Sequence, residues 1–550
     1  GNVHTEQPLR IIQTRMVDPF GKSIRRRKIS PEEWYQRYKE KVEPRVVEFM
    51  KLNPNEREQF PDVHFKTPKW IQQLKLFIQR DFATKKANRQ YLTIALLEAP
   101  LLALLLGFFS KYSATSEYLL RFNDNIPAFF FMSVVVALFI GLSISAEEIF
   151  KDNKIRKREE FLNLSRGAYL TSKIIILFAL SAVQVLSFVL ISDYILNIQD
   201  VAFSTWAILF TTACFANLLG LNLSAGLNSI VAIYILVPLL LIPQLLFSGV
   251  IIDFNKMYNT LNSYEKTPLI GDVMTSRWAY EALAVNLYKN NDYQENIFAE
   301  EVEKNEFGFK AFYFIPELEK YLFSYQTYIN NNQPEHAQLL VPLLRNSFGD
   351  LNAEIPPAND SVLWAANQIS ENSFDKNANA LLNDYLEFSA KEYKARYTIA
   401  NNNLEDTYSR MLARFGNDKQ ALESFKNKHT NKKLEDLLRD KYSGNKIYIA
   451  NNRLYQGDEP IYRKPVNNNG TAHFYSAYKY IGTLKIDTAI FNIIVIWIMT
   501  FLLMVALYFD VLNKALTYVE NWRLNRQAQL RDRIFNNPMA FIKPKRQKDN

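Results

Sequence analysis

Long uncharged stretches of hydrophobic residues alternate with strongly polar stretches along this chain of 550 residues. A helix that crosses the roughly 30 Å hydrocarbon core of a bilayer needs about 20 apolar residues. Buried core helices of a soluble protein rarely occur as a series of nearly uncharged runs of that length. The pattern therefore predicts a mainly α-helical, polytopic membrane protein with six transmembrane helices. The predicted spans are Leu92–Phe109, Pro127–Ala146, Ala168–Ile191, Val201–Ala225, Leu227–Ile252 and Thr488–Phe509.

The basic residues of the chain are concentrated in three places. They precede the first apolar stretch (80–89), they occupy the loop between the second and the third (147–167), and they recur in the tail (513–550). Even numbers of spans separate these segments, so all three lie on one side, and an excess of Lys and Arg marks that side as cytoplasmic. Both termini are then cytoplasmic, and residues 253–487 form a large extracytoplasmic domain. The net charge of +9 thus reports topology, and no nucleic-acid partner is needed to explain it.

The predicted extracytoplasmic domain shows helical periodicity. Hydrophobic and aromatic positions recur every three or four residues along 382–397 and again along 404–415, as on one face of a helix. We therefore predict a mostly helical domain. It contains no Ser-His-Asp, HExxH or paired-cysteine pattern. Its aromatic residues fit internal packing and, as an alternative, a surface that binds a partner.

The segment before the first span, residues 68–91, alternates apolar and basic positions. Its basic residues suit anionic lipid head groups, so it is predicted to be an amphipathic connecting helix at the membrane surface. A plain soluble helix is the alternative. The apolar residues that share one face are Trp70, Leu74, Phe77, Ile78 and Phe82.

The fourth and fifth spans are separated by very few residues. This spacing predicts a tight helical hairpin that turns near Gly226 and Asn228. The fifth span contains Pro238 and Pro243, and each removes a backbone donor and is expected to kink the helix unless neighbours restore the lost bonds.

Cysteine and histidine place limits on the chemistry of the chain. The single cysteine, Cys214, lies in an apolar run, so no intrachain disulfide can form. Five histidines are far apart in the sequence, and none has metal-ligand spacing, so the sequence predicts no metal site. No Gly-x-x-x-x-Gly-Lys-Ser/Thr loop occurs, so no phosphate-binding loop is present. We predict no catalytic, cofactor-binding or metal-binding residues in this chain.

Three local motifs accompany the span layout. Glu147–Phe150, Arg158–Phe161 and Gly167–Lys173 place acidic residues, a charged helix and a closing lysine between the second and third spans. Phe247–Val250 ends the fifth span, and Ser276–Asn286 reads SRWAYEALAVN. Together with the layout, these motifs resemble the permease half of ABC exporters of the G subfamily.

The resemblance implies partners that the chain does not contain. Residues 1–67 resemble the end of the ATPase half and its linker in bacterial fused half-transporters, so the ABC ATPase is expected upstream or on another chain. ATP and Mg²⁺ are then used by that domain and not bound here. The resemblance also implies a homodimer in a bacterial inner membrane, surrounded by lipids. The outer region lacks the cysteines that eukaryotic relatives carry there, so their substrates are a poor guide.

The resemblance also assigns roles to particular residues. The outer gate would be Val250 and Ile251. The ATPase-coupling residues would be Glu148, Arg158, Glu159, Lys173, Trp70 and Arg80, for whose charged members a solvated surface is the alternative. The walls of a transport pathway between two protomers would be Phe131, Val135, Leu138, Leu142, Ile235, Leu239 and Leu246, each of which equally fits lipid-facing packing.

Glu98 is the acidic residue that stands out in the first span, because it lies about two turns inside the membrane. A charged carboxylate there costs about 3 kcal/mol on insertion scales. It is therefore expected to face protein, to be protonated or to pair with a neighbour such as Asn222 or Ser224. Structural support and contact with a transported substrate are both open.

These inferences lead to one function and one alternative from another class. The chain is expected to be the transmembrane part of an ATP-driven exporter that moves a hydrophobic or amphipathic, lipid-like substrate by alternating access. The alternative is a mechanotransmission or membrane-anchor protein that uses ATP to act on a periplasmic protein through its outer domain.

Overall fold

The computed structural model describes residues 6–17, 23–52, 68–112, 117–159, 164–227, 229–254, 266–355, 361–369, 376–440 and 444–536. These residues are mainly helical. The chain forms two compact units, Gly1–Thr67 and Pro68–Asn550, and each is described by itself. Asn228 and residues 537–550, which belong to the predicted hairpin turn and the predicted basic tail, lie outside the described residues.

The first unit is small and built from short elements. Strands β1 and β2 pair antiparallel. Helix α2 begins after Ser30, whose hydroxyl accepts a hydrogen bond from the Glu33 amide at 3.1 Å, and it has proline at its first position, two features typical of helix starts. None of the α2 residues is buried. The elements are α1 Glu6–Gln13, β1 Arg15–Val17, β2 Ser23–Arg27, α2 Pro31–Lys41 and α3 Glu43–Leu52.

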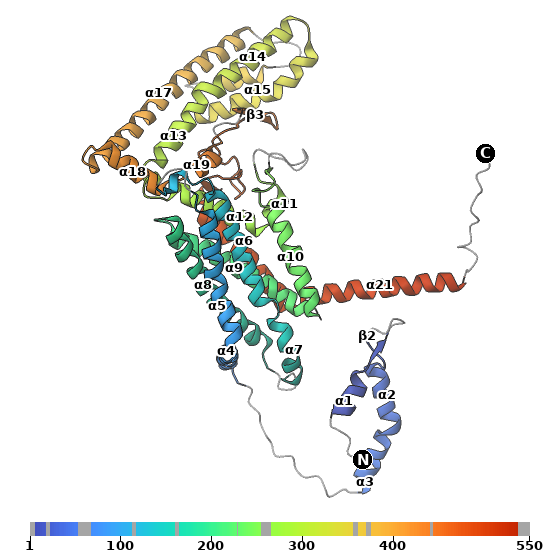
Figure 1. The fold of residues 1–550 in the computed structure, drawn as a ribbon. Coiled ribbons are helices and arrows are strands. Elements are labelled where there is room, and N and C mark those ends of the chain that lie inside the picture. Colours follow the sequence, from blue (N-terminus) through green and yellow to red (C-terminus); the bar gives the residue numbers. More distant parts are fainter. Residues whose placement is uncertain are drawn as a thin grey trace, which may run out of the picture. The chain divides into compact units, whose positions relative to one another are not determined.

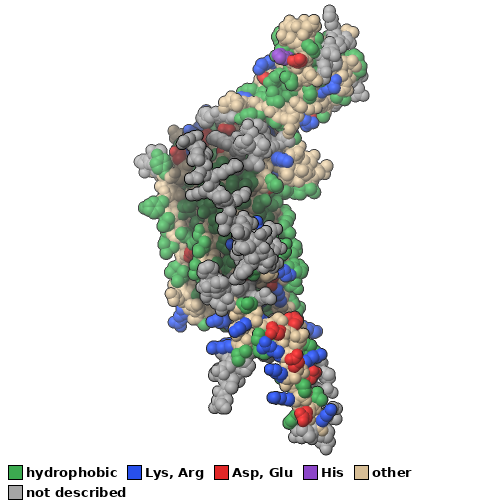
Figure 2. Space-filling view, turned by 90° about the vertical axis from the view of Figure 1, so that its right-hand side faces the viewer, with side chains coloured by type: hydrophobic (Ala, Val, Ile, Leu, Met, Phe, Trp, Pro, Cys, Tyr) green, Lys and Arg blue, Asp and Glu red, His purple; other side chains and the backbone are tan. Residues whose placement is uncertain are grey.

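The second unit contains a bundle of apolar helices (Figure 1). Five described helices, α5, α6, α8, α9 and α20, are long and apolar enough to cross a membrane, and α10 is a shorter apolar helix of 17 residues. Hydrophobic side chains gather over this bundle on the face shown in Figure 2. The bundle elements are α4 Trp70–Ala87, α5 Arg89–Ser110, η1 Leu120–Phe122, α6 Ile126–Ser145, α7 Glu148–Glu159, α8 Arg166–Leu196, α9 Ala202–Gly226, α10 Ile230–Leu246, α20 Thr488–Tyr508 and α21 Val511–Asn536.

Helix α9 forms the centre of the bundle and packs against α6, α8 and α20. Small residues allow the close approach of α6 and α9. A Cβ added to Gly141 would lie 2.5 Å from the Ala213 carbonyl oxygen, and one added to Gly220 would lie 2.0 Å from the Ser145 hydroxyl. Packing of this kind is what holds helices together where the hydrophobic effect cannot.

Helix α10 runs through both of its prolines. Pro238 and Pro243 lie inside one helix, Ile230–Leu246, so the prolines do not end it. The helix contacts α6, α9 and α12, which pack against a helix that has lost two backbone donors.

The intervening domain, which we define as the described part of residues 266–487, lies at the opposite end of the bundle from α4 and α7 (Figure 1). Its main core is formed by α13–α17. The two periodic stretches of the sequence belong to one helix of 39 residues, α17, in which Leu382, Leu386 and Tyr393 are almost fully buried. Its described strands form antiparallel pairs, β3 with β4 and β5 with β6.

The elements of the intervening domain follow in chain order. They are α11 Leu269–Asp272, α12 Thr275–Lys289, η4 Gln294–Asn296, α13 Phe298–Phe309, the π-helix η5 Lys310–Phe314, α14 Ile315–Asn330, α15 Pro334–Glu354, α16 Ser361–Asn367, α17 Lys376–Arg414, α18 Lys419–His429, α19 Lys432–Arg439, β3 Ile447–Ala450, β4 Arg453–Gln456, β5 Tyr478–Ile481 and β6 Leu484–Asp487.

Candidate functional site

A buried ion cluster joins α4, α7 and α8 at one end of the bundle. The Nζ atom of Lys173 lies 2.6 Å from Asp81 Oδ1, 2.9 Å from Asp152 Oδ2 and 3.1 Å from Glu148 Oε2. Lys85 pairs with the other oxygen of Glu148. The Lys173 side chain is only 5% exposed, so its three carboxylate partners replace its water shell. We call these five residues the Lys173 cluster.

Local structure places Lys173 where it can reach all three carboxylates. Ser165 begins α8 and its hydroxyl accepts from the Ala168 amide at 3.3 Å, which sets the start of the helix two turns before Lys173. The Ser165 amide in turn donates to the side chain of Gln73 on α4 at 2.7 Å. Tyr169 donates to Asp152 at 3.0 Å. Helices α4, α7 and α8 are therefore linked by both charged and neutral hydrogen bonds.

A second ion pair connects α4 to the end of α7 outside the Lys173 cluster. Arg80 Nη1 lies 2.7 Å from Glu159 Oε1, with side chains 41% and 29% exposed. A pair so open to solvent contributes at most about 1 kcal/mol. The pair instead helps to orient α7, because it holds the last residue of that helix against α4.

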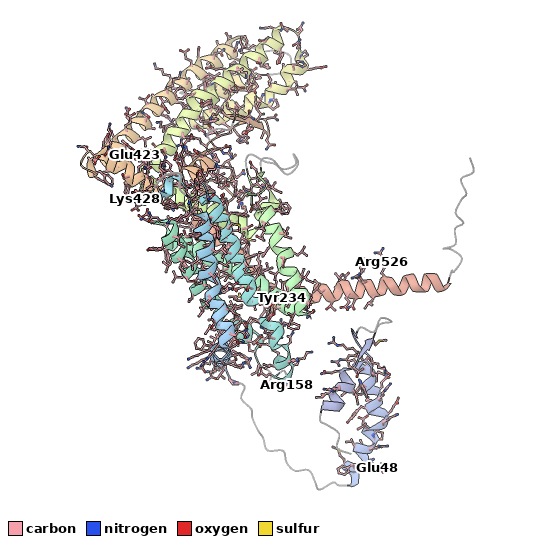
Figure 3. All side chains as sticks on the ribbon, in the orientation of Figure 1. Glu48, Arg158, Tyr234, Glu423, Lys428 and Arg526 are labelled. Atoms are coloured by element: carbon pink, nitrogen blue, oxygen red, sulfur yellow. The ribbon has the colours of Figure 1, made fainter. Side chains whose placement is uncertain are left out.

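The other two residues expected at this end take different positions. Arg158 is exposed on α7 (Figure 3). Trp70 is about half exposed at the start of α4 and lies beside Gly167, since a Cβ added to that glycine would be 3.5 Å from the indole nitrogen. Of the predicted coupling residues, Glu148 and Lys173 therefore contact each other in the Lys173 cluster, and Arg80 and Glu159 form a separate pair nearby.

Sequence reasoning did not find three members of the Lys173 cluster: Asp81, Lys85 and Asp152. One signal was present. Asp81 is the only acidic residue of α4, and it follows Phe77 by four positions, so it shares the face that packs on α8. Lys85 continues the same face one turn later.

The neighbouring helix α10 is tied to the same end of the bundle. The hydroxyl of Tyr234 donates to Glu147, which also pairs with Lys151. Tyr234, labelled in Figure 3, lies near the start of α10. Helix α7 is therefore connected to α10 as well as to α4 and α8, through the residue that precedes Glu148.

The proposed pathway residues do not face one another within one chain. Phe131, Leu138 and Leu142 of α6 are buried, because their face packs on α9 and α12, and Val135 is partly buried in the same core. The residues on α10 point away from the core, and their exposed fractions are 65% for Ile235, 57% for Leu239 and 37% for Leu246.

Glu98 has a different partner from the two that the sequence suggested. Its carboxylate accepts a hydrogen bond from Ser143 on α6. Asn222 instead donates to the carbonyls of Leu218 and Leu503. Ser224 accepts from the Ile149 and Phe150 amides, so it caps the start of α7 and is not available to Glu98.

The two gate candidates follow a sharp turn after α10. Gly249 has φ +81°, a conformation that favours glycine, and the Val250 amide donates to Ser248 at 3.3 Å. Val250 and Ile251 line a cavity of about 790 Å³ between this turn, the start of α6 and the intervening domain. Its other lining includes aromatic and charged side chains, among them Tyr280, Tyr475, Arg463, His473 and Lys433.

A second buried ionic network lies behind this cavity. Glu281 Oε2 accepts from Lys479 at 2.7 Å and from Asn492 at 2.9 Å, and Arg277 Nη1 is 3.8 Å from the same oxygen. These four residues, the Lys479 network, join α12, β5 and α20. Burial raises the pKa of Glu281, but the Lys479 and Arg277 cations outweigh that effect and hold it below its usual value. Burial lowers the pKa of Lys479 to about 8.

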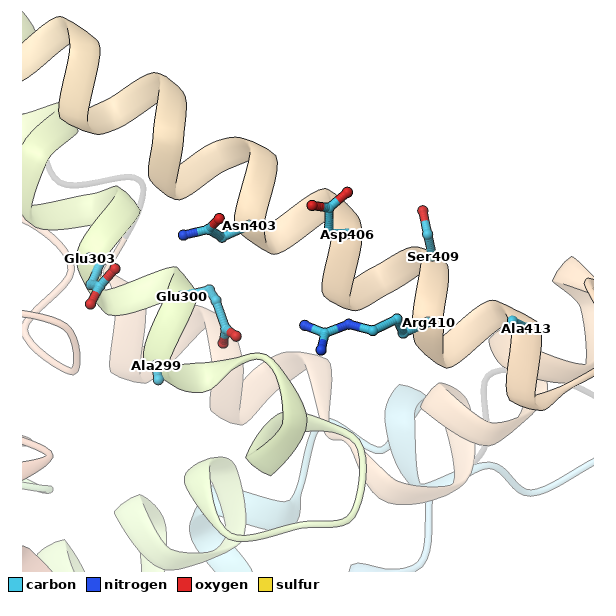
Figure 4. A pocket seen from close by; sticks show the side chains of 8 residues that line it. All are labelled: Ala299, Glu300, Glu303, Asn403, Asp406, Ser409, Arg410 and Ala413. Atoms are coloured by element: carbon cyan, nitrogen blue, oxygen red, sulfur yellow. The ribbon is translucent and has the colours of Figure 1, made fainter.

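Another surface groove lies between α13 and α17 (Figure 4). It has a volume of about 830 Å³ and is lined by polar side chains that include Glu300, Asp406 and Arg410. Thr407 connects its two walls, because it donates to Glu300 at 3.2 Å and accepts from Arg410 at 2.8 Å. An open, polar groove of this kind does not enclose a small molecule, so we do not take it as the functional site.

Comparison with known proteins adds one finding. Residues 72–288 match the family model described as ABC-2 type transporter. The matched segment runs from α4 to α12, and it contains the whole Lys173 cluster, the turn at Gly249, and Arg277 and Glu281 of the Lys479 network. No curated protein matches the chain significantly.

Proposed function

Because the chain carries an ABC-2 type transporter membrane domain, the transmembrane component of an ABC transporter, we propose that it is the permease of a G-subfamily-type exporter. It moves a hydrophobic or amphipathic, lipid-like substrate by alternating access. The observation that carries the proposal is the Lys173 cluster. It binds a surface helix, α4, and a helix between two spans, α7, to the end of a third span, α8.

Such a cluster suits the transmission of force. A displacement of α7 is transmitted to α4 and α8, because the acidic side chains of α7 are held by ion pairs to lysines on these two helices. The buried location makes each ion pair far stiffer than a surface pair. In this proposal an ABC ATPase, which uses ATP and Mg²⁺, contacts α4 and α7, and its closure rotates the bundle as a body.

Six spans complete the proposed topology. Helix α10, with 17 residues, extends about 25 Å, and a bilayer accommodates a span somewhat shorter than its hydrocarbon core by local thinning. The Lys173 cluster, the basic α7 helix and both termini then face the cytoplasm of a bacterial cell. The intervening domain is extracytoplasmic.

The exposed side chains of α10 support a dimeric pathway. Ile235 and Leu239 project from the bundle, and a second copy can place the same residues opposite them. Beyond them Val250 and Ile251 form the outer gate. The 790 Å³ cavity then receives the substrate when the gate opens.

Reconstitution tests this function. Proteoliposomes would contain the chain, its ABC ATPase and a fluorescent phospholipid analogue in the inner leaflet. We expect ATP-dependent appearance of the analogue outside, and we expect Lys173→Met to abolish this movement while ATP binding by the ATPase persists. Lys391→Met, an exposed position on α17, is the matched control and should transport normally. Equal transport by both variants would contradict the coupling role.

A mechanotransmission function is favoured by one observation. The intervening domain is joined to the bundle by buried hydrogen bonds, such as those from Lys479 to Asn492 of α20 and from Asn431 to the Leu120 carbonyl, which would transmit a movement of the bundle to that domain. In that case ATP would change the conformation of the intervening domain, as seen by distance measurements between spin labels, without any movement of lipid analogue.

A further inference from the structure

Three side chains from distant parts of the chain meet where the intervening domain contacts the bundle. Asp200 lies in the loop between α8 and α9, Asp292 follows α12, and His429 is the last residue of α18. One ligand atom from each, the Nδ1 or Nε2 of His429 or a carboxylate oxygen, lies within 4.8 Å of the other two. The Nδ1 atom of His429 already shares a hydrogen bond with Asp200. We call these residues the Asp200 cluster.

The charges of the Asp200 cluster call for a cation. Two carboxylates lie close together, and among the residues that the structure describes no lysine or arginine forms an ion pair with either one. The side chains of His429 and Asp200 are only 9% and 15% exposed. Asp200 and Asp292 are nevertheless exposed as whole residues, so solvent weakens the repulsion between their carboxylates without removing it. A bound cation removes that repulsion.

We propose that Asp200, Asp292 and His429 bind one zinc ion. Zinc takes imidazole nitrogen and carboxylate oxygen as ligands at about 2.0–2.2 Å. Three such ligand atoms around one ion lie roughly 3.4 Å from one another, and the three atoms in this structure lie within 4.8 Å of one another. Magnesium and calcium prefer oxygen alone, so the histidine favours a transition metal. The ion would replace the proton between His429 and Asp200 and leave one position for water.

The position of the site indicates a structural role. The two residues after His429 already hold the intervening domain to the bundle: Thr430 accepts from Arg121 at 2.7 Å, and Asn431 donates to the Leu120 carbonyl at 2.7 Å. Zinc would add a second fastening a few ångströms along the same junction, this time to the α8–α9 loop and the end of α12. The inference does not depend on whether the chain transports a substrate.

Spacing along the chain could not reveal this group. Asp292 is 92 residues from Asp200, and His429 is 229 residues from it. Sequence patterns for zinc rely on ligands a few residues apart. Only the packing of α18 against the loop before α9 brings the ligands together.

Metal analysis of the full chain tests the proposal. The protein would be purified in detergent without a polyhistidine tag, loaded with zinc chloride, dialysed and measured by elemental mass spectrometry. We expect about one zinc per chain, and X-ray absorption at the zinc edge should show a single imidazole ligand with oxygen neighbours. Magnesium should not be retained. Zinc should also raise the unfolding temperature, because it binds only the folded chain.

Two ligand variants and two matched controls decide the outcome. His429→Ala and Asp292→Asn should both lose the zinc and the zinc-dependent rise in unfolding temperature. Asp292 is exposed, so Asp292→Asn tests the site even if His429→Ala fails to fold. His336→Ala and Asp384→Asn change exposed residues elsewhere in the same domain and should keep the zinc. Absence of retained zinc in the unaltered chain, or equal retention in Asp292→Asn, would overturn the proposal.

Discussion

Lys479 Nζ lies 2.7 Å from Glu281 Oε2, and neither side chain has exposed surface. The pair joins strand β5 of the intervening domain to helix α12, and Asn492 of α20 donates to the same carboxylate at 2.9 Å. An ion pair this deeply buried gives little net stability compared with apolar residues, but breaking it is costly. The contact therefore specifies how strand β5 packs on α12 and α20.

Lys479→Met should destabilise the protein by about 3–5 kcal/mol, because Glu281 would keep its charge in a dry site with only Arg277 nearby. The double variant Glu281→Gln/Lys479→Met should recover much of this loss. Denaturant unfolding in detergent, followed by tryptophan fluorescence, would measure both. Lys320→Met removes an exposed lysine and should leave stability nearly unchanged. A double variant no better than the single one would contradict this account.

The same pair predicts a dependence of stability on pH. Burial lowers the pKa of Lys479 to about 8, whereas an unfolded lysine has a pKa of roughly 10.4. Between these values the unfolded chain binds more protons than the folded one, so the contribution of Lys479 to stability rises with pH in that window. Unfolding of the unaltered chain and of Lys479→Met should be compared at pH 7.5 and pH 9.5. The difference between them should grow at the higher pH, and a constant difference would contradict the lowered pKa.

Gly249→Ala should disturb the turn that carries the gate candidates. Gly249 has φ +81°, and an added Cβ would lie 2.5 Å from the ring of Phe254. We expect a loss of about 1–3 kcal/mol in unfolding free energy. Gly349→Ala is the control, because a Cβ there meets nothing within 4 Å and alanine favours the α15 helix by about 0.5–1 kcal/mol. The two substitutions should thus have opposite signs.

Most of the apolar helices could be predicted from the sequence, because a helix that crosses a bilayer must be long and apolar, and both properties can be seen in a short stretch of sequence. Five predicted spans correspond to α5, α6, α8, α9 and α20. The stretch Leu227–Ile252 yielded a shorter helix, Ile230–Leu246, since apolar residues after Leu246 form the turn at Gly249 instead. Periodicity also located the buried face of the first half of α17, whereas Tyr408 in the second predicted stretch is 43% exposed. The two stretches proved to belong to one helix.

The sites were harder to predict, because their members come from distant segments. Glu148 and Lys173 were found through resemblance, yet their partners Asp81 and Asp152 depend on how α4 and α7 pack against α8. Lys479 lies 198 residues from Glu281, and nothing in its neighbourhood distinguishes it from other lysines. The Ser143 partner of Glu98 likewise depends on the contact between two spans.

Glu98→Gln should separate the structural and the transport roles of this carboxylate. An amide can still accept from Ser143, and it costs less than a charge within a span, so folding and unfolding temperature should be preserved or improved. In the proteoliposome assay we expect transport to fall several-fold if the carboxylate contacts the substrate. Ser143→Ala is the companion variant, because it removes only the hydroxyl. If Glu98→Gln transports and assembles normally, the carboxylate has no role beyond this hydrogen bond.

The Lys173 cluster makes an asymmetric prediction, since it holds two cations, Lys85 and Lys173, against three carboxylates, Asp81, Glu148 and Asp152. Asp81→Asn reduces the excess negative charge and should cost less than about 1 kcal/mol, because Lys173 keeps two carboxylates. Lys173→Met leaves three carboxylates with one lysine and should cost about 3–5 kcal/mol.

Thermal unfolding of the two variants in the same detergent tests this order. The double variant Asp81→Asn/Lys173→Met should be more stable than Lys173→Met alone, because it removes one of the carboxylates that lost its partner. If Asp81→Asn is instead as damaging as Lys173→Met, the cluster acts through the single Asp81–Lys173 hydrogen bond between α4 and α8, and its net charge does not govern its stability.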